Sequence, residues 1–111
     1  MRMSTDYHTL LVNNGIQLGI PGLEDIALQR ADALYAVKLL RTTAIPILGG
    51  DVWLRRGSKI ELAYANWHTD GEIGEDKGAY LQRTWDSTER YIREFPVPTD
   101  AEPLFVLVTA K

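Results

Sequence analysis

Two short segments of this chain gather residue types that could do chemistry. In the first, Gly49 and Gly50 precede Asp51 within an otherwise apolar stretch from Ile45 to Trp53. Two glycines weaken a regular strand and typically mark a bulge or a close backbone approach, so we expect a buried strand with an irregularity at Asp51. The carboxylate is then either a general base poised by burial or an acceptor of backbone N–H groups around the glycines, and we favour the second role.

The second segment is an acidic loop from His68 to Asp76, which holds four carboxylates in nine residues. Its spacing does not fit a calcium-binding EF-hand, and the other histidine, His8, is far away in sequence. We therefore expect no dedicated metal site and no cofactor. Concentrated carboxylates can instead steer a basic protein partner, and tryptophan is a residue type that anchors interfaces. The candidate partner-binding residues are Trp67, His68, Asp70, Glu72, Glu75 and Asp76, and the alternative is a solvated loop beside a core tryptophan.

Other catalytic arrangements have little support in the sequence. No serine lies in a Gly-x-Ser-x-Gly elbow, and no phosphate-binding lysine follows Gly49 and Gly50. The chain has two histidines and no cysteine. We therefore expect a protein that is not an enzyme. The alternative is a small hydrolase or ligand-binding domain that uses Asp51, with Glu61 or His68 nearby.

The composition is that of one globular domain spanning residues 1–111. Hydrophobic residues make up 45% of the chain and charged residues 24%, the balance of an ordinary globular protein. A net charge of −3 argues against binding nucleic acid, which favours a basic stripe. No apolar run approaches the ~20 residues that span a bilayer, and the first six residues lack a signal-peptide core. Together with the absence of cysteine, these features predict a cytoplasmic protein with no membrane partner.

Hydrophobic periodicity predicts three helices around the two segments. The first covers residues 5–14, and the glycine that follows it is expected to close the helix in the left-handed conformation. The second runs from about Gln29 to Thr42, with apolar residues at helical spacing. The third runs from about Lys77 to Glu94 and has a nearly ideal apolar stripe. Between the first two, residues 16–26 are punctuated by glycine and proline and predict an ordered connector.

Three strands complete the expected domain. Val52–Leu54 and Lys59–Trp67 are joined by a short glycine-containing loop, which predicts an antiparallel hairpin. Alternation in the second strand places Ile60, Leu62 and Tyr64 on one face. The continuous apolar run Leu104–Val108 predicts a strand that is covered on both faces or lies inside the sheet. The order ααββαβ predicts an α+β domain, with a small, mostly antiparallel sheet of about three strands packed with about three helices.

This order of features resembles the immunity protein 40 family of bacterial polymorphic toxin systems. The resemblance covers roughly residues 15 to 110, and its strongest element is the string Ile47-Leu48-Gly49-Gly50-Asp51-Val52. The other matching segments are Ala27 to Leu34, Asn66-Trp67, Tyr91-Ile92 and Leu104 to Leu107. The chain departs from the pattern at Gln29, where we expect a serine or threonine helix cap.

The resemblance implies a cytosolic protein without enzymatic activity that binds a cognate toxin domain and occludes its active site. Charge complementarity would contribute if the toxin is a basic nuclease domain. The family supplies no defined binding motif, so the contact residues remain those of the acidic loop. Homo-oligomerisation and the identity of the toxin are left open.

Overall fold

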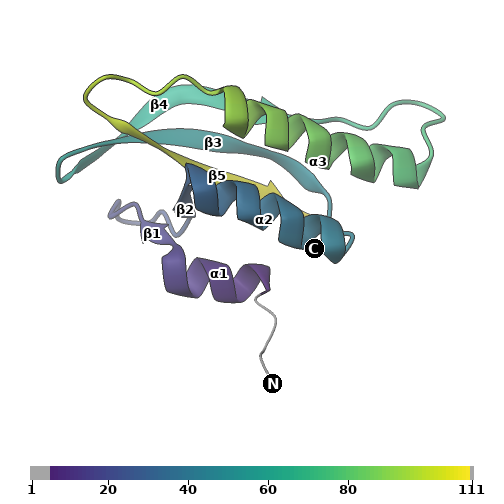
Figure 1. Ribbon diagram of the computed structural model, residues 1–111, viewed down its shortest axis with the longest axis horizontal. Helices are drawn as coiled ribbons and strands as arrows, with labels where there is room; N and C mark the ends of the chain where they lie inside the picture. The colour runs from purple at the N-terminus through teal and green to yellow at the C-terminus, as the bar shows by residue number, and fades with distance from the viewer. Residues whose placement is uncertain (1–5, 111) are drawn as a thin grey trace.

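The computed structural model describes residues 6–110, which form three helices and a five-stranded sheet. The elements follow in the order α1 (Tyr7–Asn14), β1 (Ile16–Gln17), β2 (Ile26–Gln29), α2 (Arg30–Thr42), β3 (Ile47–Arg56), β4 (Lys59–His68), α3 (Lys77–Glu94) and β5 (Glu102–Thr109). The strands are paired antiparallel in the order β1-β2-β5-β3-β4. Helices α2 and α3 pack on the sheet and against each other, and α1 lies beside α2 (Figure 1). The α+β class is confirmed, but the sheet has five strands and not about three.

Of the two additional strands, β1 lies in the segment that was expected to be a connector, and β2 begins at the last residue of that segment and runs to Gln29. Ile16 and Gln17 of β1 pair with Ala27 and Ile26 of β2, and residues 18–25 form the loop between the two strands. Strands of two and four residues are too short to give a recognisable alternation. Gly15 before β1 has a φ of −68° and not the expected left-handed conformation. Glycine is needed there because a side chain would collide with Ile26 and with the Leu11 carbonyl.

The predicted helices are confirmed, with small changes at their ends. Residue 5, the expected start of the first helix, lies outside the described residues, and α1 begins at Tyr7 after the Asp6 cap. Helix α2 begins at Arg30, and its cap residue Gln29 makes no side-chain hydrogen bond to the helix. The apolar face of α2 contains the residues expected from their spacing, namely Ala33, Ala36, Val37 and Leu40.

The main core lies between the helices and one face of the sheet. Val37 and Leu40 of α2 and Ile92 of α3 pack there with Val52 of β3 and Phe105 of β5. Each large apolar side chain that is fully buried in such a core contributes about 1.5–3 kcal/mol relative to an exposed one. This core therefore fixes which face of β3 and β4 is left for solvent.

The opposite face of the sheet, here called the open face, is covered only in part. Leu18 in the loop between β1 and β2 packs there with Ala27, Leu104 and Val106, and Trp53 lies at the margin of the cluster. Strand β5 consequently has buried residues on both of its faces, as its continuous apolar run predicted. Further along the open face, side chains of β3, β4 and β5 reach solvent, and this uncovered end holds Asp51.

Candidate functional site

Three strands bring the candidate residues together at the uncovered end of the open face. Asp51 pairs with Asn66 of β4 and Val106 of β5, and Gly49 pairs with His68 and with Val108. Residues directly opposite each other point to the same face of a sheet. The strand residues around Asp51 surround a shallow hollow of about 220 Å³, here called the Asp51 hollow. It is lined by Leu48, Gly49, Gly50, Asp51, Asn66, Trp67, His68 and Val108.

Gly49 and Gly50 are required by close packing around this hollow. A side chain on Gly50 would collide with the Trp67 indole ring and the Val106 carbonyl, and one on Gly49 would collide with the Trp67 carbonyl. Strand β3 shifts its register with β5 between Ile47 and Gly49, so the irregularity that the glycines predicted is present. Asp51 itself lies just beyond this shift, in regular pairing with both neighbouring strands.

The Asp51 carboxylate is half-buried and accepts no hydrogen bond from any residue between 6 and 110. The expectation that backbone N–H groups around the glycines bind it is therefore wrong. The physical reason is that β3 is an interior strand, and the ladders with β4 and β5 already use the backbone groups around Asp51. The carboxylate instead points to the open face.

The groups suggested for a hydrolase are only partly assembled. His68 lines the same hollow as Asp51, but Glu61 is opposite Leu54 on the other face and accepts a hydrogen bond from Arg56 Nε at 2.8 Å. The lining contains no serine, threonine, cysteine, lysine or tyrosine that could act as a nucleophile. No specific observation thus favours hydrolysis.

Two of the four carboxylates of the acidic loop, those of Glu75 and Asp76, bind groups within the protein and hold the loop in place. Glu75 accepts two hydrogen bonds from Arg83, both at 2.8 Å, and the same guanidinium donates to the Asp70 carbonyl at 2.6 Å. These bonds to Arg83 lower the pKa of Glu75 to about 2. Asp76 caps α3, because its carboxylate accepts the Ala79 N–H at 3.2 Å. Glu75 and Asp76 therefore fasten the loop to the helix.

The other half of the acidic loop faces solvent. The Asp70 side chain is 85% exposed, and its carboxylate lies 3.7 Å from Nε2 of His68, which is itself 73% exposed. Glu72 is exposed as well, and the neighbouring Ile73 is a fully exposed apolar side chain. His68 belongs both to the hollow and to this pair with Asp70, so the hollow and the loop form one continuous surface.

Trp67 lies in the core and offers little to a partner. It is only 9% exposed, and its indole N–H donates to Thr88 Oγ1 at 2.9 Å. Its ring stacks on Tyr91 with 4.6 Å between centroids and also lies against Gly50. This is the core tryptophan of the alternative interpretation, and we leave Trp67 out of the candidate surface.

Tyr64 of β4, which was expected on one face of its strand together with Ile60 and Leu62, is 87% exposed. Val52 pairs with Ala65 whereas Trp53 pairs with Leu62, so Ala63 and Tyr64 form a bulge. Tyr64 has a φ of +57°, a conformation that L-residues with bulky side chains rarely adopt. Bulges redirect side chains and are frequent next to functional sites. The aromatic residue was visible in the sequence, but its bulge and its exposure were not.

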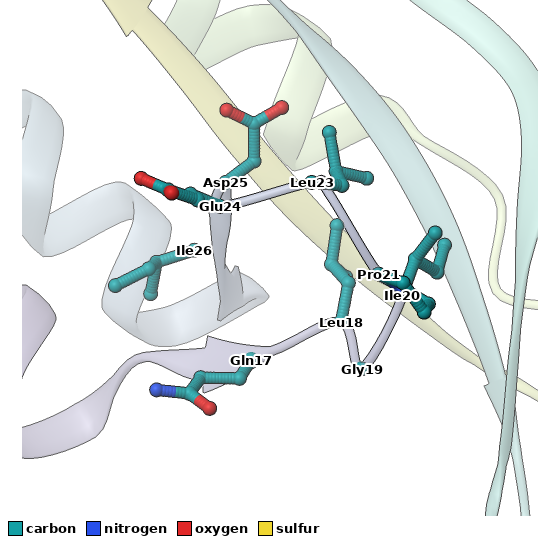
Figure 2. Close-up of a pocket in the computed structure, with 9 residues that line it drawn as sticks. All are labelled: Gln17, Leu18, Gly19, Ile20, Pro21, Leu23, Glu24, Asp25 and Ile26. Carbon is teal, nitrogen blue, oxygen red and sulfur yellow. The ribbon is translucent and has the colours of Figure 1, made fainter.

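A larger hollow lies elsewhere, in the loop between β1 and β2 (Figure 2). It has a volume of about 410 Å³ and is lined mainly by apolar residues, including Leu18 and Leu23. Figure 2 shows the carboxylates of Glu24 and Asp25 pointing in different directions. They do not converge on a common point, so this hollow presents no arrangement of groups for chemistry.

Between residues 6 and 110, no cluster of three or more histidine, aspartate or glutamate side chains is arranged to hold a metal ion. No helix in that range combines the length and the apolar character that crossing a membrane requires. The candidate site thus consists of the Asp51 hollow and the exposed part of the acidic loop.

Comparison with known proteins identifies one family. The family model described as Immunity protein 40 matches residues 15–109. This range begins after α1 and includes all five strands, the Asp51 hollow and the acidic loop. No curated protein and no solved structure matches the chain.

Proposed function

Because the chain belongs to the immunity protein 40 family, we propose that it binds a cognate bacterial toxin domain and neutralises it by covering the toxin's active site. The observation that carries this proposal is the family match, which extends over 15–109 of the 111 residues. In this account the protein acts as a stoichiometric inhibitor in the bacterial cytoplasm and catalyses no reaction on the toxin.

The construction of the acidic loop supports binding to a protein. Arg83 and the Asp76 cap hold the base of the loop, while Asp70, Glu72 and Ile73 are exposed. A loop that is ordered before binding loses less conformational entropy when the complex forms. Exposed carboxylates accelerate the approach of a basic partner, so a basic toxin such as a nuclease domain would fit this surface.

Strand β4, which leads into the loop, adds an exposed aromatic side chain. Tyr64 is exposed on the bulge, and tyrosine is enriched among the residues that dominate binding energy at interfaces. A standard interface buries about 800 Å² on each partner. The loop, the Asp51 hollow and Tyr64 are spread over β3, β4 and the segment that leads to α3, and we propose that the toxin spans them.

The direct test is co-expression with a toxin domain whose gene lies next to the gene for this chain, here called the adjacent toxin domain. We expect growth of the bacterial host to recover and a one-to-one complex to elute in size-exclusion chromatography. An unrelated toxin domain serves as the control for specificity. If the adjacent toxin kills equally well when this protein is in excess, and no complex forms, the proposed function is wrong.

A second measurement separates occlusion from chemical inactivation. Toxin recovered from the complex by denaturation and refolding should have unchanged mass and full activity. A covalent change of mass in that toxin would instead favour the enzymatic alternative.

A further inference from the structure

The Asp51 hollow has the features of a receptor for one cationic side chain. We propose that a lysine or arginine side chain of the toxin enters this hollow and pairs with the Asp51 carboxylate; this inference rests on the proposed function and specifies the partner's chemistry. Three features of the hollow support this pairing, namely its charge, its shape and its continuity with the acidic loop.

The Asp51 carboxylate brings a negative charge to the hollow. No ion pair to Asp51 forms among residues 6–110, although the nearby arginines of β3 are paired. Arg55 donates to Glu102 at 2.6 Å, and Arg56 contacts both Glu61 and Asp100. A partner that covered the half-buried Asp51 carboxylate without bringing a cation would remove it from water uncompensated, which is unfavourable. Charge complementarity therefore selects a positively charged group.

The hollow has room for a side chain beside Asp51. A side chain on Gly49 would meet backbone atoms, so this position stays small and leaves the hollow empty beside Asp51. Leu48 and Val108 provide apolar walls that are 38% and 46% exposed. Lysine and arginine place their methylene stems along apolar surface while the charged group reaches a polar partner. The Asn66 amide in the same lining supplies a second acceptor.

The hollow is held in a regular sheet and continues into the acidic loop. Asp51 lies on an interior strand that is paired on both sides, so its backbone is fixed before a partner arrives. The rim residue His68 also lies beside Asp70 of the acidic loop. A toxin that is steered by the loop would therefore arrive next to the hollow.

The test compares the binding of the adjacent toxin domain to wild type, Asp51→Asn and Asp51→Lys. We expect Asp51→Asn to weaken affinity roughly 30-fold or more, mainly through faster dissociation, and Asp51→Lys to abolish protection of the host. Glu94→Gln is the matched control, because it removes an exposed carboxylate from α3, which packs on the other face of the sheet. Its affinity should equal that of wild type.

A second variant leaves Asp51 intact. Val108→Lys places a cation at the rim and should repel the incoming side chain, with weaker binding as the result. A scan of the toxin's lysines and arginines to glutamate should identify one position that restores binding to Asp51→Lys. Circular dichroism and thermal unfolding of each variant establish that it is folded before its affinity is compared.

Each outcome has a separate meaning. If wild type does not bind the adjacent toxin, the proposed function fails. If wild type binds, but Asp51→Lys and Val108→Lys bind within about twofold of it, the present inference is overturned while the function stands. If Asp51→Asn leaves toxin binding unchanged and dissociates a homodimer of this protein, the occupant is a second copy and the inference is again overturned.

Discussion

The acidic loop and the Asp51 hollow both present carboxylates to solvent, but different forces position them. In the loop, the hydrogen bonds of Glu75 to Arg83 and the Asp76 cap hold the chain in place, so two of its four acids serve structure. In the hollow, pairing on both sides of β3 holds the backbone and leaves Asp51 without an internal partner. The comparison shows that an acidic cluster can offer fewer carboxylates to a partner than its composition suggests, because some of them bind within the protein. A single carboxylate on a sheet, such as Asp51, can remain free to bind a partner.

The largest expected effect comes from filling the space beneath the hollow. Gly50→Ala should destabilise the protein by about 2–3 kcal/mol, because the added methyl group would collide with the Trp67 ring and the Val106 carbonyl. Gly71→Ala in the acidic loop is the matched control, since a methyl group there meets only Tyr80 at 3.9 Å. Urea unfolding of both variants measures the difference. Equal urea midpoints for the Gly50→Ala and Gly71→Ala variants would show that the two regions do not differ in packing.

Tyr64 allows stability and binding to be separated on β4. Tyr64→Gly should raise the free energy of unfolding by up to about 1 kcal/mol, since glycine adopts a φ of +57° without the cost that L-residues bear. Little packing is lost because the ring is 87% exposed. The same variant should bind the toxin more weakly. Unchanged affinity would remove Tyr64 from the proposed surface.

The pKa of Glu75 predicts how the loop responds to acid. Because folding lowers this pKa from 4.5 to about 2, the carboxylate stabilises the folded state fully above pH 4.5. That contribution is lost progressively as the pH falls from 4.5 towards 2. The unfolding midpoint of wild type should exceed that of Glu75→Gln at pH 6, and the gap should narrow over this range. A gap that stays constant from pH 6 to pH 2 would contradict the role of the Glu75–Arg83 pair.

The smallest effect is expected from neutralising only the exposed acids of the loop. Asp70→Asn combined with Glu72→Gln should slow association with a basic toxin by about two- to fivefold at low salt, with little change in dissociation. Stopped-flow measurements at two salt concentrations test this. Glu75 and Asp76 are left intact so that the loop keeps its structure. An association rate that does not change would dismiss steering by the loop.

Sequence periodicity predicted the parts of the fold that are long and regular. Helices α2 and α3 and the β3–β4 hairpin follow from apolar spacing and from the turn at Gly57. Strands β1 and β2 were not predicted, because their pairing becomes visible only in three dimensions. The bulge at Tyr64 is likewise a property of strand register, which local composition does not encode.

The candidate site was predictable only in part. The sequence indicated Asp51, His68 and the acidic loop, but long-range contacts decided their roles. Glu75 is held by Arg83, which lies eight residues later in the chain, on α3. Trp67 is held in the core by its hydrogen bond to Thr88 and by stacking on Tyr91. Which face of the sheet remained open depended on where α2 and α3 pack.

The central claim is that the toxin binds across the Asp51 hollow and the acidic loop. The most direct measurement follows backbone amide shifts of isotope-labelled protein as a catalytically inactive form of the adjacent toxin domain is added. The account predicts that the perturbed amides lie within residues 48–51 and 66–76 and at Tyr64 and Val108, while the amides of the solvent-facing residues of α2 remain unchanged. Perturbations confined to α1 and α2, with none at residues 48–51 or 66–76, would contradict it.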